Sequence, residues 1–196
     1  MTPEYNSDIH AAVEVLRRGG VILYPTDTVW GLGCDACNSE AVRRIFSIKQ
    51  RADAKALITL VGSLAQLERT VDCIPEVGYQ LIEFSERPVT VVYDRPAVSA
   101  GIAPELLAED GTIGVRLTKE EFSARLCQAF RRPLVSTSAN ISGQPAPRVY
   151  TEIAPEILES VDYVCLSRRG EAADANVRPS SIIRLGEDGS FKIIRE

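Results

Sequence analysis

Short apolar segments alternate with segments of helical period along most of this chain. Runs such as 21–24 and 89–93 are continuously apolar or β-branched and predict buried strands, whereas 120–130 carries apolar residues at helical spacing. Alternating strands and helices are typical of an α/β sheet covered by helices. A hairpin expected around 186–190 makes this sheet mixed rather than purely parallel.

The same patterns place the other elements. A first helix is expected to start at a cap on Ser7 or Asp8 and to end at Gly19 and Gly20. The segment 97–110 carries few signals and is expected to be a mobile surface loop. Further helices are expected at 38–48, 63–70, 76–84 and 151–158, and further strands at 56–61, 112–117, 133–135, 161–166, 180–185 and 191–195.

Composition limits the classes of protein that fit. The 196 residues are 45% hydrophobic and 25% charged, which predicts one domain over 1–196. No apolar run approaches the roughly 20 residues that cross a bilayer, and the N-terminus does not resemble a secretory signal. We therefore expect a cytoplasmic protein without a membrane partner. The net charge of −5 argues against a generally basic nucleic-acid binder but permits a local basic patch.

Cysteine and histidine exclude other chemistries. The five cysteines are an odd number without a secretory signal, so we expect free thiols. Cys34 and Cys37 form a close pair that could serve redox or metal chemistry, but no second pair supports a zinc site. His10 is the only histidine and lies in the first expected helix, which argues against a Ser-His-Asp mechanism. Catalysis must then depend on cations, hydroxyls and a metal that no protein side chain is expected to hold.

The segment 136–143 concentrates hydroxyl and amide groups. Ser136, Ser138 and Asn140 directly follow the apolar residues 133–135, which predict a short buried strand. Open α/β sheets bind ligands in loops at the carboxyl ends of their strands. Hydroxyls and free backbone N–H groups suit phosphate oxygens, or a magnesium ion between them.

A second polar segment follows the first expected strand. Thr26, Asp27 and Thr28 lie beside Trp30, an arrangement that suits a small polar substrate held against a ring. Gly31 and Gly33, in the same segment 25–33, are expected to let the backbone approach a ligand closely. The alternative is an ordinary turn with a packed tryptophan.

Basic residues gather between positions 43 and 55. Arg43, Arg44, Lys49, Arg51 and Lys55 oppose Asp53 alone, a local charge of +5 − 1 = +4. Lys49 and Arg51 lie where the helical pattern ends, so they could neutralise a polyphosphate and stabilise charge during nucleotidyl transfer. The alternative is a solvated helix end, where cations are favoured anyway.

Polar groups also mark two strands. Arg116 is embedded in an apolar strand and needs an anionic partner, either a substrate carboxylate or a protein carboxylate. Ser180 and Ser181 start a strand near another possible ligand edge, and the alternative there is a surface strand.

Five motifs in this order resemble those of the YrdC/Sua5 family, the threonylcarbamoyl-AMP synthases. The order and spacing hold from about residue 7 to residue 195. Residues 25–32 (PTDTVWGL) resemble PTxTxYGL, 49–51 (KQR) resemble KxR, 111–117 (GTIGVRL) resemble GTIGVRxP, 136–143 (STSANISG) resemble STSANxSG, and 179–183 (PSSII) resemble PSTVV.

The resemblance implies a fold and a reaction. The fold is a twisted open mixed sheet with flanking helices and a large concave cavity. The reaction joins L-threonine, bicarbonate and ATP, the last with Mg²⁺, into threonylcarbamoyl-adenylate, pyrophosphate and water. Its product serves N6-threonylcarbamoylation of adenosine 37 in tRNA, which makes tRNA and the transferase of that modification possible partners.

The resemblance also implies roles for single residues. Lys49, Arg51, Ser138 and Asn140 fall on the family's catalytic set. Thr28 and Arg116 are the candidates for holding threonine. The expected nucleotide-binding residues are Ser136, Ser138, Asn140, Ser180 and Ser181.

The chain departs from the family's motifs at Ala52, at 85–87 and at 118–120. Two other functions therefore stay open. The first is an RNA-binding module of the same fold, for tRNA or double-stranded RNA, which the local basic cluster motivates. The second is a divergent paralogue that acts on another small acid, which the departures motivate.

Overall fold

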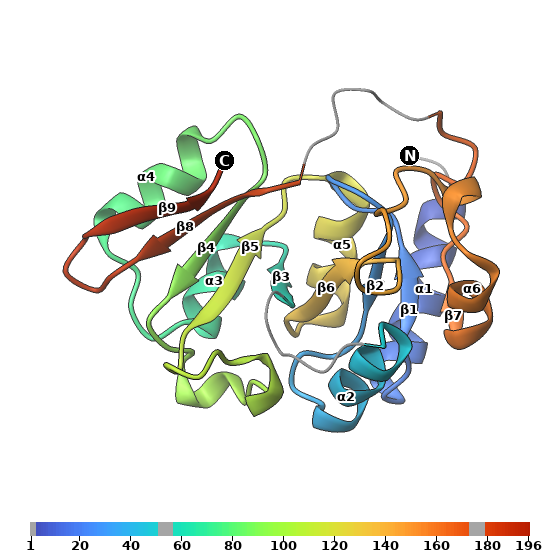
Figure 1. Cartoon of the computed structure of the whole chain (residues 1–196), viewed down its shortest axis with the longest axis horizontal. Coiled ribbons are helices and arrows are strands. Elements are labelled where there is room, and N and C mark those ends of the chain that lie inside the picture. The colour runs from blue at the N-terminus through green and yellow to red at the C-terminus, as the bar shows by residue number, and fades with distance from the viewer. Residues whose placement is uncertain (1–2, 51–56, 173–178) are drawn as a thin grey trace.

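The computed structural model describes residues 3–50, 57–172 and 179–196. Within these ranges, helices and strands alternate as the sequence predicts, and Figure 1 shows their arrangement. The α-helices are α1 (Pro3–Arg17), α2 (Ser39–Ile48), α3 (Leu64–Thr70), α4 (Glu76–Phe84), α5 (Glu121–Phe130) and α6 (Pro155–Ser160). The strands are β1 (Ile22–Tyr24), β2 (Gly31–Gly33), β3 (Ile58–Val61), β4 (Val89–Tyr93), β5 (Ile113–Leu117), β6 (Leu134–Ser138), β7 (Tyr163–Val164), β8 (Ser181–Leu185) and β9 (Phe191–Arg195). Short 3₁₀ helices are η1 (Val98–Ala100), η2 (Pro104–Leu106) and η3 (Tyr150–Glu152).

The described strands form one sheet in the order β7-β1-β2-β6-β3-β5-β4-β8-β9. The pairs β1–β7, β3–β5 and β4–β8 are parallel, and the other neighbouring pairs are antiparallel. The expected mixed α/β sheet is therefore confirmed, and so is the terminal hairpin of β8 and β9.

Apolar side chains pack on both faces of this sheet. Alternate residues of β1 enter different clusters: Leu23 packs with α2 and α6, whereas Ile22 packs with α1 and α5. A third cluster joins α3 and α4 to β4, β5 and β8. The helices α1, α2, α5 and α6 therefore cover both faces of one end of the sheet, and α3 and α4 pack against the other end.

The first helix begins earlier than expected. It includes Ser7 and Asp8, so neither residue is its cap. Asp8 is instead buried, and its carboxylate accepts hydrogen bonds from Tyr163 Oη (2.7 Å), Leu166 N (2.9 Å) and Ser167 N (2.7 Å). Asp8 is thus of a type that often caps helices, but here it anchors the loop after β7 to α1.

The glycines of β2 serve packing rather than a ligand. A Cβ on Gly33 would come within 2.6 Å of the Tyr24 ring, and one on Gly31 within 3.3 Å of Thr137 O. The expectation that these glycines open the backbone to a ligand is therefore wrong, because the space beside them is filled by the neighbouring strands.

Three other expectations need adjustment. The strand expected at 133–135 is β6, which continues to Ser138, so Ser136 and Ser138 lie on a strand and not in a loop. The segment 97–110 contains η1 and η2, and Leu106 of η2 is buried against α2. The single helix expected at 151–158 is divided into η3 and α6. In the ranges that the structure describes, no helix combines the length and apolar character needed to cross a bilayer.

Candidate active site

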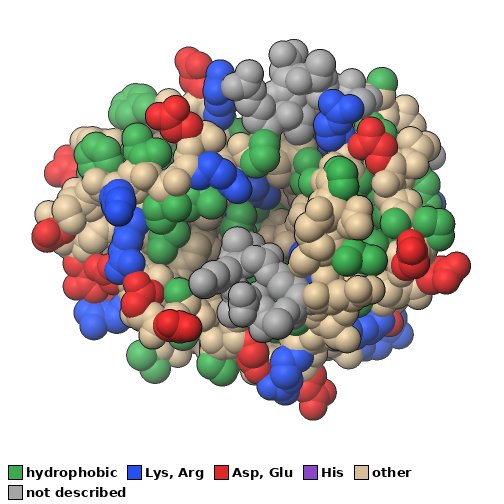
Figure 2. Space-filling model, in the orientation of Figure 1, with side chains coloured by type: hydrophobic (Ala, Val, Ile, Leu, Met, Phe, Trp, Pro, Cys, Tyr) green, Lys and Arg blue, Asp and Glu red, His purple; other side chains and the backbone are tan. Residues whose placement is uncertain are grey.

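A cavity of about 1080 Å³ lies among β4, β5, β6 and β8. Figure 2 shows the surface hollowed near its centre, with basic side chains in blue beside the hollow. Its size is near the upper limit of the roughly 300–1,000 Å³ typical of small-molecule sites. It brings together most of the residues expected from the sequence: Thr28, Lys49, Arg116, Ser136, Ser138, Asn140 and Ser180.

Lys49 enters this cavity from the end of α2. Asn38 caps the start of that helix by accepting hydrogen bonds from Glu40 N and Ala41 N, and Lys49 is its C-terminal cap. The lysine is 2% exposed. Its Nζ donates to Ser138 O (2.6 Å) and to Asn140 O (2.8 Å). The positive charge is thereby fixed at the base of the polar loop that follows β6.

Asn140 shapes the same loop with its amide. Its Nδ2 donates to Ile141 O (2.9 Å) and to Gln144 O (2.7 Å). Among the residues that the structure describes, its buried Oδ1 has no hydrogen-bond partner. Because buried polar atoms are normally paired, this oxygen is available to a ligand in the cavity.

Arg116 finds the anionic partner that its strand position requires. Its Nη2 forms an ion pair with Asp27 Oδ1 at 3.1 Å, so a protein carboxylate provides that partner. Its Nη1 lies 3.5 Å from Thr28 Oγ1. The buried Nε has no hydrogen-bond partner within the described ranges. One edge of the guanidinium is thus held while another donor remains for a ligand.

Asp27 was named in the sequence only as a polar neighbour, and its role depends on the fold. Burial raises the pKa of its carboxyl, and Arg116 opposes that rise. Thr118 Oγ1 also contacts its Oδ2 at 3.4 Å. The sequence predicts that the buried Arg116 needs a carboxylate partner. It does not identify Asp27 as that partner, because the two residues lie far apart in the chain.

The serines of the site divide between two positions. Ser136 is buried in β6, and Ser180 Oγ shares a hydrogen bond of 2.8 Å with Thr90 Oγ1. Both line the cavity. Ser181 follows Ser180 on a strand, where successive side chains point to opposite faces, and it is not among the lining residues. Arg51 lies outside the described residues.

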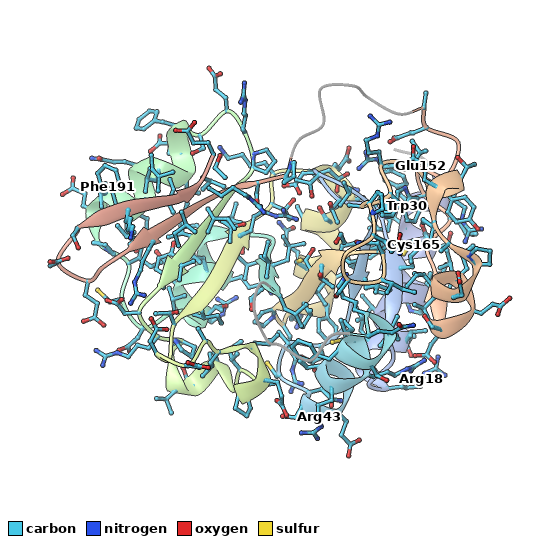
Figure 3. The ribbon with its side chains drawn as sticks, viewed as in Figure 1. Arg18, Trp30, Arg43, Glu152, Cys165 and Phe191 are labelled. Carbon is cyan, nitrogen blue, oxygen red and sulfur yellow. The ribbon has the colours of Figure 1, made fainter. Side chains whose placement is uncertain are left out.

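Trp30 and the nearby basic residues do not join the cavity. Trp30 is buried in the core, with its ring centroid 5.4 Å from that of Tyr150, and it does not line the cavity. The interpretation of Trp30 as a packed tryptophan is therefore confirmed, and its interpretation as a ring that holds a substrate is wrong. Arg43 pairs with Glu105 and Arg44 with Asp162. Figure 3 shows Arg43 at the lower edge of the molecule, away from the centre.

Several residues that line the cavity were not predicted from the sequence. Arg184 of β8 donates to Asp110 Oδ2 at 2.6 Å, and both line the cavity. Hydrogen bonds from Thr112 and Arg184 lower the pKa of Asp110 to about 2. The only signal in the sequence was the alternation of polar residues in 180–184, which points Arg184 to the same side as Ser180.

Metal-binding side chains are not gathered in the described part of the chain. No group of three or more His, Cys, Asp or Glu residues there could hold a metal ion. The cysteines are free, as expected, and burial raises the pKa of Cys37 to about 11. Burial also raises the pKa of Cys34, so both Cys34 and Cys37 are thiols at neutral pH.

A smaller cavity of about 290 Å³ is lined by residues of β4 and β5 that alternate with those lining the first. Val89, Val91 and Val115 contribute to its walls. Its rim includes residues 85–87 and Lys119, from two of the segments where the chain departs from the family's motifs. The departures at 85–87 and 118–120 thus lie outside the lining of the larger cavity.

The fold and the cavity define an α/β protein with a mixed sheet and a cavity of a size that suits a small-molecule ligand. Comparison with known proteins then identifies the family. The Sua5/YciO/YrdC family model, described as telomere recombination, matches residues 14–196. The chain belongs to this family, which confirms the resemblance seen in its motifs.

Three relatives illustrate the family. A protein named threonylcarbamoyl-AMP synthase from Pseudoalteromonas translucida is 40% identical over 179 residues, which cover 90% of this chain and 92% of the relative. The YciO structure from E. coli has a TM-score of 0.81 and 26% identity, and the match covers 100% of this chain and 91% of that one. The structure of P. abyssi Sua5 complexed with L-threonine has a TM-score of 0.79 and 29% identity, covering 90% of this chain and 50% of that one. The chain thus spans about half the length of that Sua5.

Proposed function

We propose that this protein is a threonylcarbamoyl-AMP synthase. It joins L-threonine, bicarbonate and ATP to give threonylcarbamoyl-adenylate, pyrophosphate and water. Membership of the Sua5/YciO/YrdC family supports this reaction, as does the likeness to a Sua5 that was crystallised with L-threonine. The adenylate is consumed by a transferase that modifies adenosine 37 of tRNA, which implies a cytoplasmic enzyme.

One observation carries the proposal. The cavity is lined by Arg116 and Asn140, and each of them has one buried polar atom without a hydrogen-bond partner in the described ranges, Nε and Oδ1 respectively. The first is a cationic donor and suits a carboxylate, and the second is an acceptor and suits an ammonium or hydroxyl group. An amino acid supplies groups of both kinds.

The proposed chemistry brings two anions together. The threonine amine first forms a carbamate with bicarbonate, and water is lost. The carbamate oxygen then attacks the α-phosphorus of ATP; the new O–P bond forms as the bond to the leaving pyrophosphate breaks. The attacking oxygen is already ionised, so no general base is needed. Fixed positive charge and alignment lower the barrier, and Lys49 and Arg116 supply both within the cavity.

The remaining site residues take roles from their positions. We place the threonine at Thr28 and Arg116, which lie 3.5 Å apart, and the nucleotide along Ser136, Ser138, Asn140 and Ser180. Arg51 stays in the proposal as a second cation on the strength of its motif. Ser181 does not line the cavity, so we propose for it only an indirect role, as the neighbour of Ser180 in the chain.

Mg²⁺ fits this cavity only as a companion of ATP. The carboxylates that line the described part of the cavity are Glu109 and Asp110, and Arg184 already occupies one oxygen of Asp110. Mg²⁺ in nucleotide sites keeps several waters and binds mainly phosphate oxygens. When bound there it neutralises charge on the phosphates.

The test is pyrophosphate release from ATP and Mg²⁺, with and without L-threonine and bicarbonate. Release that requires both supports the synthase. L-serine and L-aspartate in place of threonine test the divergent paralogue, and turnover of threonine alone excludes it. The proposal is contradicted if pyrophosphate release does not depend on threonine, or if a folded protein that binds ATP releases no pyrophosphate.

A further inference from the structure

The smaller cavity and the larger one share two strands. Side chains alternate along a strand, so neighbouring residues of β4 and β5 point to opposite faces of the sheet. Val91 and Val115 line the smaller cavity, whereas Thr90 and Arg116 line the larger one. The smaller cavity of about 290 Å³ is therefore a separate space, on the side of the sheet that α3 and α4 cover.

The walls of the smaller cavity are mostly apolar. Leu67 of α3 and Ile82 of α4 face the valines of the sheet across it. Tyr93 also lines it and is only 2% exposed, yet its hydroxyl has no hydrogen-bond partner in the described ranges. Burial raises the pKa of this hydroxyl, so the group stays protonated and offers both a donor and an acceptor.

The charged groups in this cavity are arranged by depth. Glu86, Arg87 and Lys119 are exposed at the rim, and Lys119 Nζ donates to Glu83 O and Ser85 O, both at 3.2 Å. The other two lining carboxylates are more buried, because the side chains of Asp27 and Glu120 are only 13% and 16% exposed.

Glu120 is largely satisfied by neighbouring groups. It accepts hydrogen bonds from Phe122 N and Ser123 N at the start of α5 and pairs with Arg168 at 3.4 Å. The carboxylate of Asp27 forms an ion pair with Arg116 and a long contact, of 3.4 Å, with the hydroxyl of Thr118. Its pKa is nevertheless raised, because burial outweighs the effect of Arg116. A further cation beside Asp27 would offset that burial.

We propose that the smaller cavity binds a small organic amine with an apolar body. The ammonium group lies against Asp27, the body packs on Leu67, Ile82 and Val115, and Tyr93 provides a second polar contact. This site goes beyond the synthase reaction and does not depend on it, since none of the substrates takes part in binding.

The size of the cavity selects the probe. An apolar cavity of about 150 Å³ can hold benzene, so one of about 290 Å³ accommodates a ring with a short aminoalkyl arm. Benzylamine is such a molecule. Benzyl alcohol has nearly the same shape without the charge, and phenylacetate has the opposite charge.

Occupation of this site is coupled to the larger cavity through one shared residue. Asp27 lines the smaller cavity and pairs with Arg116, which lines the larger one. An ammonium group at Asp27 competes with the guanidinium for the carboxylate. Binding on one side of the sheet therefore alters the hydrogen bonding of Arg116 on the other, and the coupling is reciprocal.

The experiment is a titration of the full chain followed by backbone amide and arginine Nε resonances, without ATP or threonine. We expect benzylamine to bind with a dissociation constant on the order of a millimolar and to shift the amides of Val91, Tyr93 and Val115. Benzyl alcohol should bind about tenfold more weakly and phenylacetate not at all, because charge-assisted hydrogen bonds are roughly twice as strong as neutral ones. The Arg116 Nε resonance should move with benzylamine alone.

Two variants locate the site. Ile82→Trp fills the cavity, and Tyr93→Phe removes the hydroxyl; each should weaken benzylamine binding at least fivefold. Leu64→Trp is the control, because Leu64 is 42% exposed on α3 and does not line the cavity. The dispersed amide spectrum shows that each variant folds.

Three results overturn the proposal: no benzylamine binding at millimolar concentration, equal affinity for benzyl alcohol, or shifts confined to the larger cavity. An Arg116 Nε resonance that stays still while the smaller cavity fills overturns the coupling. Because no substrate is present, none of these results bears on the synthase reaction, and failure of pyrophosphate release leaves the amine site standing.

Discussion

At the residue scale, Lys49 shows how burial changes the meaning of a charged side chain. A lysine that is 2% exposed must be held by acceptors, and here two backbone carbonyls accept from its Nζ. Those carbonyls belong to Ser138 and Asn140, which are site residues themselves. Lys49 therefore fixes the geometry of the loop and at the same time supplies positive charge to the cavity.

Lys49→Met tests both effects together. Removing the charge should lower the rate of pyrophosphate release by about 10²-fold or more, by analogy with the loss of a fixed electrostatic donor. Steady-state kinetics with saturating ATP and threonine measures the change. Arg43→Met is the matched control, because it removes a basic residue of α2 that is exposed and pairs with Glu105. Equal activity of the two variants would show that Lys49 has no part in catalysis.

At the element scale, α2 was readily predicted because its signals are local. Asn38 stands just before an apolar pattern of helical period, and the structure places it as the cap. Strand β2 was missed because Gly-Leu-Gly carries no strand signal of its own. Its place is fixed by pairing with β1 on one side and with the distant β6 on the other.

Asn38→Ala tests how far this cap supports the site. The substitution leaves Glu40 N and Ala41 N without their acceptor and should lower the free energy of unfolding by about 1 kcal/mol. Urea denaturation measures the loss. Asn38→Asp keeps an acceptor at the helix start and should retain most of the stability. A loss as large in Asn38→Asp as in Asn38→Ala would contradict the capping role.

Asp110 joins the segment after η2 to β8, and its ionisation should be visible in acid. Hydrogen bonds from the Thr112 hydroxyl and from Arg184 lower its folded pKa to about 2, against about 3.9 in the unfolded chain. A lowered pKa stabilises the fold above the unfolded value, and this contribution disappears as the pH falls from about 4 to about 2. In Asp110→Asn the free energy of unfolding should therefore fall less over that range.

The measurement is urea denaturation at several pH values between 2 and 5. Glu109→Gln removes the same charge from the neighbouring position and should follow the parent protein. If the free energy of unfolding fell as steeply with acid in Asp110→Asn as in the parent, the hydrogen bonds from Thr112 and Arg184 would not lower the pKa of Asp110.

At the scale of the whole molecule, the class of fold was predictable and the assembly of the site only in part. The alternating patterns predicted a mixed α/β sheet. The motifs singled out Lys49, Ser138 and Asn140, which line the cavity in the structure. The pairing of Asp27 with Arg116 depends on the segment after β1 reaching β5 although β2, β6 and β3 lie between the two strands in the sheet, and no local pattern reveals that contact. Trp30 was interpreted without its partner Tyr150, which comes from a distant segment.

Charge at this scale argues against the RNA-binding alternative. The sequence count of +4 treats every cation between 43 and 55 as available, but Arg43 and Arg44 each pair with a carboxylate of another segment, and Lys49 is buried. Arg51 and Lys55 lie outside the described residues. The chain as a whole carries −5, so long-range attraction to a polyanion is weak.

We therefore expect unmodified tRNA to bind no more tightly than about 10⁻⁵ M at physiological salt, within the range of non-specific contacts. Fluorescence anisotropy at several salt concentrations measures the affinity and its salt slope. The double variant Arg43→Ala, Arg44→Ala should leave both unchanged, because these arginines are already neutralised by Glu105 and Asp162. Submicromolar binding whose slope falls by about two in the double variant would mean that tRNA displaces those carboxylates, and RNA binding would then belong to the function of this surface.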